Sequence, residues 1–247
     1  MFTAVYTGSH WDADVTGMPG LVDRTFREWT SNLDPSGSRI AIFQHIRDIP
    51  YALNARENSG ATPAERILLA GRGSCGPKHY LLAEMYRHLG LEVAFATFPF
   101  LWDDPSLLYP PDLRRLATGL PVAYHLACRV RIDNRWVLVD ATWDRGLLKG
   151  GFPINENWDG RSDTRCAVKP LKSAVRTAFC RTATNEPCRS EEDSLFRPLD
   201  GEEIHGDEDD QVHYYRQKTG IRSPGEIGRI RQFYPAFDAW LEQVRRE

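Results

Sequence analysis

Two apolar segments separated by the pair Asp133-Asn134 constrain the fold of this 247-residue chain more than any other feature. Residues 124–132 and 135–140 read as strands, and an Asp-Asn pair tolerates the positive φ of a two-residue hairpin turn. A turn of this length sets the register, and it places His125 and Asp140 on one face as diagonal neighbours, roughly 7–8 Å apart at the backbone. A slip of one residue would put them on opposite faces. The sequence therefore predicts an antiparallel pair that holds an imidazole beside a carboxylate.

A glycine-rich approach to a helix lies upstream of this hairpin. Residues 71–78 read Gly-Arg-Gly-Ser-Cys-Gly-Pro-Lys, and apolar residues keep helical spacing from there to Leu89, with Gly90 placed to end the helix. Cys75 is expected in the first turn, where the helix dipole and free N–H groups favour a thiolate and can stabilise an oxyanion. A cysteine taken alone is more often a buried, inert residue. A histidine oriented by a carboxylate is the partner that a nucleophilic thiol needs.

These three parts together resemble the transglutaminase-like superfamily. The match comprises Gly-Ser-Cys75 at a helix start, a strand with His125 about 50 residues on, and Asn-Arg-Trp-Val-Leu-Val-Asp140-Ala-Thr-Trp, within roughly residues 38–145. The resemblance implies an α+β, papain-like core in which the nucleophile helix packs on an antiparallel β-sheet, with helical N- and C-terminal extensions. It assigns Cys75 as nucleophile, His125 as general base and acid, and Asp140 as the orienting carboxylate, with no cofactor.

The resemblance further implies thiol-mediated acyl transfer. An amide or isopeptide bond would be attacked by Cys75 to give a thioester, which passes to water in a peptidase or amidase and to an amine in an acyltransferase. Hydrolysis is favoured because water is the ubiquitous acceptor. Two alternatives stay open: a non-catalytic binding or scaffold module that retains the fold, and acetyl transfer, although nothing in the sequence indicates a coenzyme A site. Leu126-Ala127 stands where many members carry an aromatic residue, so their substrate channel is not carried over.

Three residues are tentative substrate contacts. Lys78 could lower the pKa of the thiol or bind a substrate carboxylate, the alternative being a surface charge on an exposed helix face. Trp102 and Tyr109, in a proline-rich connection over residues 99–121, could line a substrate groove or anchor that connection onto the core. His79 is a rival base that ranks below His125, because it should point away from a cysteine at the helix start.

The remaining cysteines give no metal signal. Five cysteines form an odd, irregular set, typical of thiols in a reducing compartment rather than of a disulfide framework. Cys128 falls on the strand face opposite His125 and is expected in the core. No C-x-x-C spacing links Cys166, Cys180 and Cys188. A zinc site is therefore not predicted, even with His205 or His213 as a further ligand. We therefore predict no metal.

Composition excludes several classes of protein. An apolar fraction of 41% is enough for a sizeable core and excludes a wholly disordered chain. A net charge of −3 argues against a nucleic-acid-binding protein. No targeting signal or membrane-spanning run is evident, so a cytoplasmic protein is expected, with a peptide, protein or small amide as substrate. The oligomeric state stays open.

Local signals outline the rest of a single domain over residues 1–247, with a catalytic core at about 38–160 and a C-terminal extension at 161–247. Capping signals and apolar spacing predict further elements. These are helices near 21–29, 38–48, 62–70 and 223–244, the last interrupted by Pro235, and a strand at 93–98. The acidic run Glu202–Asp210 is expected to be a solvated loop, and it lacks the spacing of a calcium-binding loop.

Overall fold

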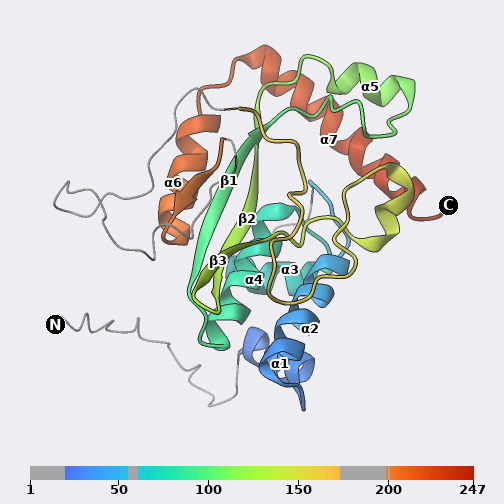
Figure 1. Ribbon diagram of the computed structural model, residues 1–247. Coiled ribbons are helices and arrows are strands. Elements are labelled where there is room, and N and C mark those ends of the chain that lie inside the picture. The colour runs from blue at the N-terminus through green and yellow to red at the C-terminus, as the bar shows by residue number, and fades with distance from the viewer. Residues whose placement is uncertain (1–19, 55–60, 173–198, 200) are drawn as a thin grey trace, which may run out of the picture.

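A four-stranded antiparallel sheet organises the computed structural model, which describes residues 20–54, 61–172, 199 and 201–247. The strands lie in the order β3-β2-β1-β4 (Figure 1). They are β1 (Val93–Phe100), β2 (Ala123–Ile132), β3 (Arg135–Val139) and β4 (Glu203–His205). The helices are α1 (Leu21–Thr30), α2 (Pro35–Asp48), α3 (Pro63–Ala70), α4 (Cys75–His88), α5 (Pro111–Ala117), α6 (Glu208–Thr219) and α7 (Pro224–Val244), with a 3₁₀ helix at Arg145–Gly150. Together they form the mixed α+β architecture that was expected.

The central hairpin has the predicted register. Ile132 pairs with Arg135 across a turn in which Asp133 and Asn134 adopt φ values of 49° and 61°. Side chains of β2 therefore alternate between two faces. Cys128 and Val130 point into the larger hydrophobic core, whereas Ala127 packs in a smaller cluster with Ala96 and Phe98. The prediction that Cys128 is a core residue is confirmed, since its side chain is fully buried.

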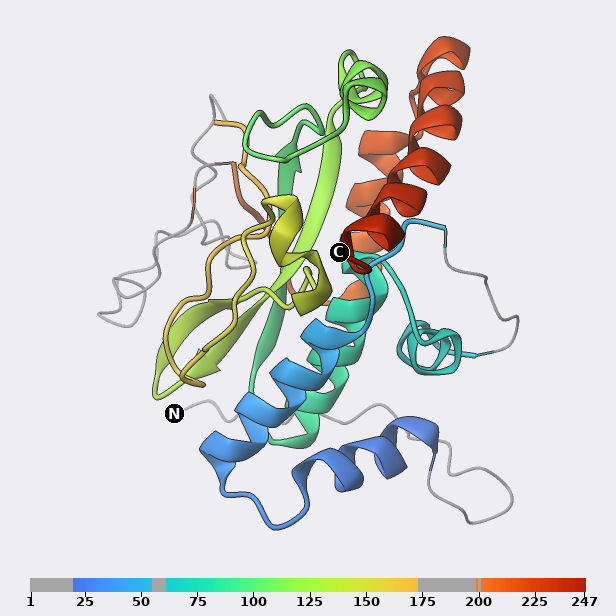
Figure 2. The ribbon, with the colours of Figure 1, turned by 90° about the vertical axis from the view of Figure 1, so that its right-hand side faces the viewer.

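Helix α4 joins the N-terminal helices to the sheet. Leu81, Leu82 and Met85 on α4 are fully buried and share a core with Ile42 and Ile46 of α2 and with residues of β2 and β3. Figure 2 shows α2 and α4 running side by side next to the sheet. Because this packing secures the whole length of α4, it also sets the position of the helix start, where Cys75 lies.

Helix starts follow the capping chemistry in the sequence, with one shift. Thr62 and Ser223 each form a full capping box, with Glu65 and Glu226 respectively. Helix α2 begins earlier than predicted, at Pro35, because the Asp34 side chain accepts the Gly37 N–H at 2.6 Å. The proline-rich connection also contains α5, which was not predicted.

The C-terminal extension differs from the prediction in two ways. Helix α7 continues through Pro235 rather than breaking there, since a buried face that includes Phe233, Phe237 and Leu241 packs on both sides of the proline. The acidic run is not a solvated loop but forms β4 and the start of α6. Glu202 is buried, and its carboxylate accepts two hydrogen bonds from the guanidinium of Arg129 on β2, at 2.6 and 2.7 Å.

Two sequence predictions concern parts of the chain outside this description. Cys180 and Cys188 lie outside the described residues, as does the segment before residue 20. Among the described residues, no helix is both long and apolar enough to cross a bilayer.

Candidate active site

Cys75 occupies the first position of α4, directly after a constrained turn. Gly73 in this turn donates its N–H to Pro50 O and accepts the N–H of Ala52, both at 3.1 Å. A Cβ on Gly73 would lie 2.9 Å from Cδ1 of the buried Ile67, so only glycine fits without displacing that side chain. The Ser74 side chain makes no capping bond, which leaves first-turn N–H groups of α4 without a side-chain acceptor. Cys75 is half-buried and therefore open to a reagent from one side.

His125 connects Cys75 to Asp140. Its Nε2 lies 2.8 Å from Oδ2 of Asp140, and the imidazole is also hydrogen-bonded to the Cys75 thiol, for which Nδ1 remains. His125 and Asp140 are both almost fully buried. The structure therefore brings together the three side chains that the sequence placed in one constellation, and the diagonal neighbours of the predicted hairpin are in direct contact.

The electrostatics of the three groups favour an ion pair between sulfur and imidazole. Burial opposes ionisation of Cys75, but the hydrogen bond and charge of His125, together with the Leu126 N–H, lower the pKa of the thiol. Burial likewise opposes a charge on His125, yet Asp140 and Cys75 raise the pKa of its imidazole to about 10. The pKa of Asp140 is lowered to about 2 despite burial, because His125 stabilises the carboxylate.

Asp140 is held by hydrogen bonds that the sequence did not reveal. Oδ2 also accepts the Ala167 N–H at 2.7 Å, and Oδ1 accepts the Thr142 hydroxyl at 2.6 Å. Thr164 Oγ1 accepts the backbone N–H of Asp140 at 2.8 Å. Thr142 could have been found, because a hydroxyl two residues after a carboxylate is a common local partner. Thr164 and Ala167 come from the C-terminal extension, and no local pattern indicates them.

His79 is a buried structural partner of Cys75. Its Nε2 accepts the Ala141 N–H at 3.1 Å, so the proton of the neutral ring is on Nδ1, which donates to Cys75 O at 2.9 Å. Burial lowers the pKa of His79 to about 4. A ring whose two nitrogens are both occupied by backbone groups is not available as a base. His79 instead links the start of α4 to the residue after Asp140.

Lys78 is not the surface charge that one sequence interpretation gave, and it does not line the pocket beside Cys75. Its side chain is fully buried, and Nζ donates to the carbonyls of Arg47, Ile49 and Thr142 at 2.7–2.8 Å. Burial lowers the pKa of Lys78 to about 7, although three carbonyl acceptors match the three hydrogens of the ammonium form. Lys78 thus ties the end of α2 to the segment after β3.

The Lys78→Met variant is expected to lower the free energy of unfolding by about 2–4 kcal/mol, because three buried carbonyls lose their donor. Urea unfolding monitored by circular dichroism measures this. The matched control is Lys218→Met on the exposed side of α6, which should change stability by less than about 0.5 kcal/mol. Equal, small effects of the two variants would contradict the structural role of Lys78.

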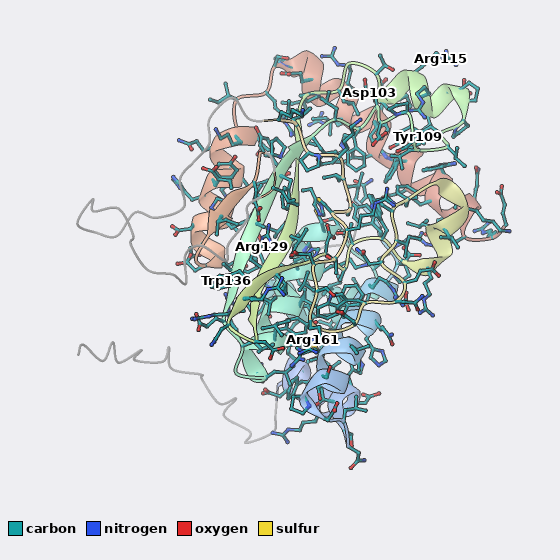
Figure 3. The ribbon with its side chains drawn as sticks, viewed as in Figure 1. Asp103, Tyr109, Arg115, Arg129, Trp136 and Arg161 are labelled. Carbon is teal, nitrogen blue, oxygen red and sulfur yellow. The ribbon has the colours of Figure 1, made fainter. Side chains whose placement is uncertain are left out.

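Trp102 and Tyr109, the other tentative contacts, have different surroundings. Both are buried and pack against Phe233 and Phe237 of α7. Only Trp102 also lines the pocket that contains Cys75. Figure 3 shows Tyr109 near α5 and α7. Tyr109 therefore anchors the proline-rich connection onto the core, as the second interpretation held. Trp102 both anchors that connection and lines the pocket.

The pocket beside Cys75, here called the thiol pocket, has a volume of about 390 Å³. Its floor and walls include Cys75, His125, Trp102 and Trp143. Part of the wall comes from the C-terminal extension, including Gln211, Tyr215, Arg216, Arg222 and Tyr234. Sequence reasoning missed this wall, because contacts between α6, α7 and the core are set by tertiary packing and leave no local pattern.

Cys166 lies near the His125–Asp140 pair but does not make a convincing metal centre. The potential ligand atoms of Cys166, His125 and Asp140 lie within 4.8 Å of one another. Burial, with the charge of Asp140, raises the pKa of Cys166 and keeps it a thiol. Both carboxylate oxygens of Asp140 already accept hydrogen bonds. These donors fit a hydrogen-bonded catalytic geometry better than the thiolate-rich sites that bind zinc.

Comparison with known proteins finds a family similarity in the core that holds these residues. Comparison with curated proteins gives no match. Among solved structures, the chain is similar to a protein from Cytophaga hutchinsonii described as a candidate cysteine protease, at 18% identity and a TM-score of 0.36. This alignment covers 49% of the present chain and 36% of the other. The family model for the transglutaminase-like superfamily matches residues 25–141, a range that contains Cys75, His125 and Asp140. The match covers a little under half of the chain, and over this core the chain is similar to the transglutaminase-like superfamily.

Proposed function

We propose that this protein is a cysteine-dependent amidohydrolase or acyltransferase that cleaves amide or isopeptide bonds through a thioester on Cys75. The observation that carries the proposal is the continuous contact from the Cys75 thiol through His125 to the buried carboxylate of Asp140. A thiol without a base, or a base without an orienting group, would not supply the same activation.

In the first half of the proposed reaction, the Cys75 thiolate attacks the carbonyl carbon of the substrate and forms a C–S bond. The carbonyl oxygen becomes an oxyanion, and the N–H groups of Cys75 and Gly76 at the start of α4 are the proposed donors to it. Protonated His125 then gives its proton to the leaving nitrogen as the C–N bond breaks. An amine departs, and an acyl group remains on the sulfur as a thioester.

In the second half, neutral His125 takes a proton from the acceptor, and the acceptor attacks the thioester carbonyl. With water as acceptor the product is a carboxylic acid, and with an amine it is a new amide. The C–S bond breaks and the thiolate is restored. Asp140 stabilises the charge on His125 in both halves and keeps Nε2 turned away from the sulfur. Hydrolysis is the proposed default, since water needs no dedicated site.

A non-catalytic scaffold that retains the fold is the competing proposal. It gives no reason for the lowered pKa of Cys75 or for the four hydrogen bonds that the described residues make to the Asp140 side chain. Acetyl transfer from coenzyme A uses the same thioester chemistry, and its test is acylation of Cys75 that depends on acetyl-CoA.

Trapping the thioester tests the proposed function. The protein would be mixed with panels of peptide amides, small acyl amides and activated acyl esters, quenched in acid, and digested for mass spectrometry. We expect an acyl adduct on the peptide that contains Cys75. Acylation that instead favours Cys128 or Cys166, or an absence of acylation on Cys75 by every activated ester, would contradict the proposal.

A further inference from the structure

The described lining of the thiol pocket is positively charged, although the chain as a whole is negatively charged. The chain as a whole has a net charge of −3. Among the described residues that line the pocket, no carboxylate is present, and Arg216 and Arg222 supply cationic side chains. The rest of the lining is largely aromatic, including Tyr51, Tyr80 and Trp143. A charge beside aromatic walls is less screened than a charge in open water, so these arginines should act strongly on a ligand.

Arg222 is the better placed of the two. It lies in the short connection between α6 and α7 and is half-buried, whereas Arg216 is exposed on α6 at the rim. Arg222 and Tyr234 line the same pocket; burial raises the pKa of the Tyr234 phenol to about 12, and the nearby charge of Arg222 opposes that rise. The guanidinium of Arg222 therefore lies near Tyr234 at the pocket. A guanidinium has five N–H donors, so it can bind a carboxylate there.

A carboxylate of the protein could have neutralised Arg222 internally, and Glu226 is the nearest such group in sequence. Its side chain is committed to the start of α7, where it accepts the Ser223 N–H at 2.7 Å and the Ser223 hydroxyl at 2.8 Å. Among the described residues, Arg222 and Arg216 form no ion pair with an acidic side chain within 4.0 Å. The charge of Arg222 acts on Glu226 and helps to lower its pKa, but the two form no ion pair, so the guanidinium can still bind a ligand.

A neighbouring cavity also has a lining with more positive than negative side chains. It measures about 770 Å³ and shares Phe100, Trp102, Trp143 and Val168 with the thiol pocket. Among the described residues, its charged lining comprises Arg165, Lys169 and Lys172 against the carboxylate of Asp104. Two adjoining cavities with net positive linings favour a substrate that carries negative charge on more than one part.

We propose, building on the proposed function, that the thiol pocket selects acyl substrates that carry a carboxylate, such as the amides of acidic peptides, with Arg222 as the main specificity-determining residue. The carboxylate pairs with the guanidinium of Arg222 while the acyl carbon lies against the sulfur of Cys75. Arg216 adds a weaker attraction at the rim.

Two alkylating reagents that differ only in charge test this proposal without a known substrate. N-iodoacetylglycine carries a carboxylate, and its N-methylamide is neutral. With either reagent, the Cys75 sulfur displaces iodide and forms a thioether. The ratio of the two alkylation rates at Cys75, normalised to the same ratio for glutathione, measures the preference for negative charge. The proteins compared are wild type, Arg222→Gln and Arg216→Gln, with Arg231→Gln as control because Arg231 is exposed on α7 and lines neither cavity.

We expect wild type to prefer the anionic reagent, and Arg222→Gln to reduce that preference roughly five- to tenfold, the effect of one charge-assisted hydrogen bond at a half-exposed site. Arg216→Gln should reduce it less, and Arg231→Gln should leave it unchanged. In wild type, about 0.5 M KCl should also weaken the preference, and this check needs no variant.

If Cys75 reacts readily with both reagents but the ratio is insensitive to Arg222 and to salt, this inference fails and the proposed function stands. If Cys75 reacts with neither, both fail.

Discussion

Replacing Cys75 with alanine is expected to reduce acyl transfer by at least about 10⁴-fold, because removal of the nucleophile leaves only binding and oxyanion stabilisation. The fold should be retained, since Cys75 is half-buried and the change to alanine removes only its sulfur atom. Turnover of the acyl amide identified by the trapping experiment measures the loss, with circular dichroism to verify folding.

Cys128→Ala is the matched control for this variant. Cys128 is fully buried, and burial raises the pKa of its thiol, so it should contribute to stability and not to turnover. We expect the control to keep wild-type activity while it unfolds at a lower urea concentration. Equal turnover by Cys75→Ala and wild type would contradict the assignment of Cys75 as nucleophile, and turnover by neither would leave the scaffold proposal standing.

The Asp140→Asn variant should show the second large effect, a decrease in acyl transfer of roughly 10²- to 10⁴-fold. The amide has the same shape, but it removes the charge that raises the pKa of His125. Without an imidazolium beside it, Cys75 loses the main group that lowers the pKa of its thiol. The negative charge of Asp140 by itself raises the pKa of the thiol, but His125 has the larger effect. Loss of the imidazolium therefore makes the pKa of the thiol rise, and alkylation of Cys75 requires a higher pH.

This shift separates a positioning role from a loss of folding. A variant that was only destabilised would have fewer folded molecules, but its pH profile of alkylation would keep its midpoint. Asp159→Asn is the control, because Asp159 is an exposed carboxylate that accepts backbone N–H groups from Arg161 and Ser162. It should leave both the activity and the pH profile as in wild type. An Asp140→Asn profile that superimposes on wild type would contradict the assigned role of Asp140.

The positions of the three contacting side chains on their own helix and strands could be predicted from the sequence, because local rules determine each position. A two-residue turn fixes which residues face each other, so the contact of His125 with Asp140 followed from the pair Asp133-Asn134. A glycine turn followed by helical spacing similarly placed Cys75 at the start of α4. Whether the helix start and the hairpin would meet was a tertiary question, for which only the family resemblance gave an answer.

The errors have a common physical origin. Lys78 was interpreted from its charge, but three carbonyls from distant segments satisfy it inside the protein. The acidic run near Glu202 was interpreted as solvated, but Arg129 on a central strand pairs with Glu202. Local patterns describe the preference of a residue for water, and they do not describe partners that long-range packing supplies. For the same reason the arginine-containing wall of the thiol pocket could not be predicted.

The pH dependence of Cys75 alkylation by iodoacetamide tests the central claim most directly. Mass spectrometry of the wild-type digest would give the rate at Cys75 from about pH 5 to pH 10, with Cys128 as an internal reference. The thiolate–imidazolium pair predicts that the alkylation rate of Cys75 reaches its midpoint below about pH 8.5, the pKa of a free cysteine, and that Cys75 reacts far faster than Cys128 at pH 7. A rate that rises only through about pH 8.5, or a folded protein in which Cys75 is as unreactive as Cys128, would contradict it.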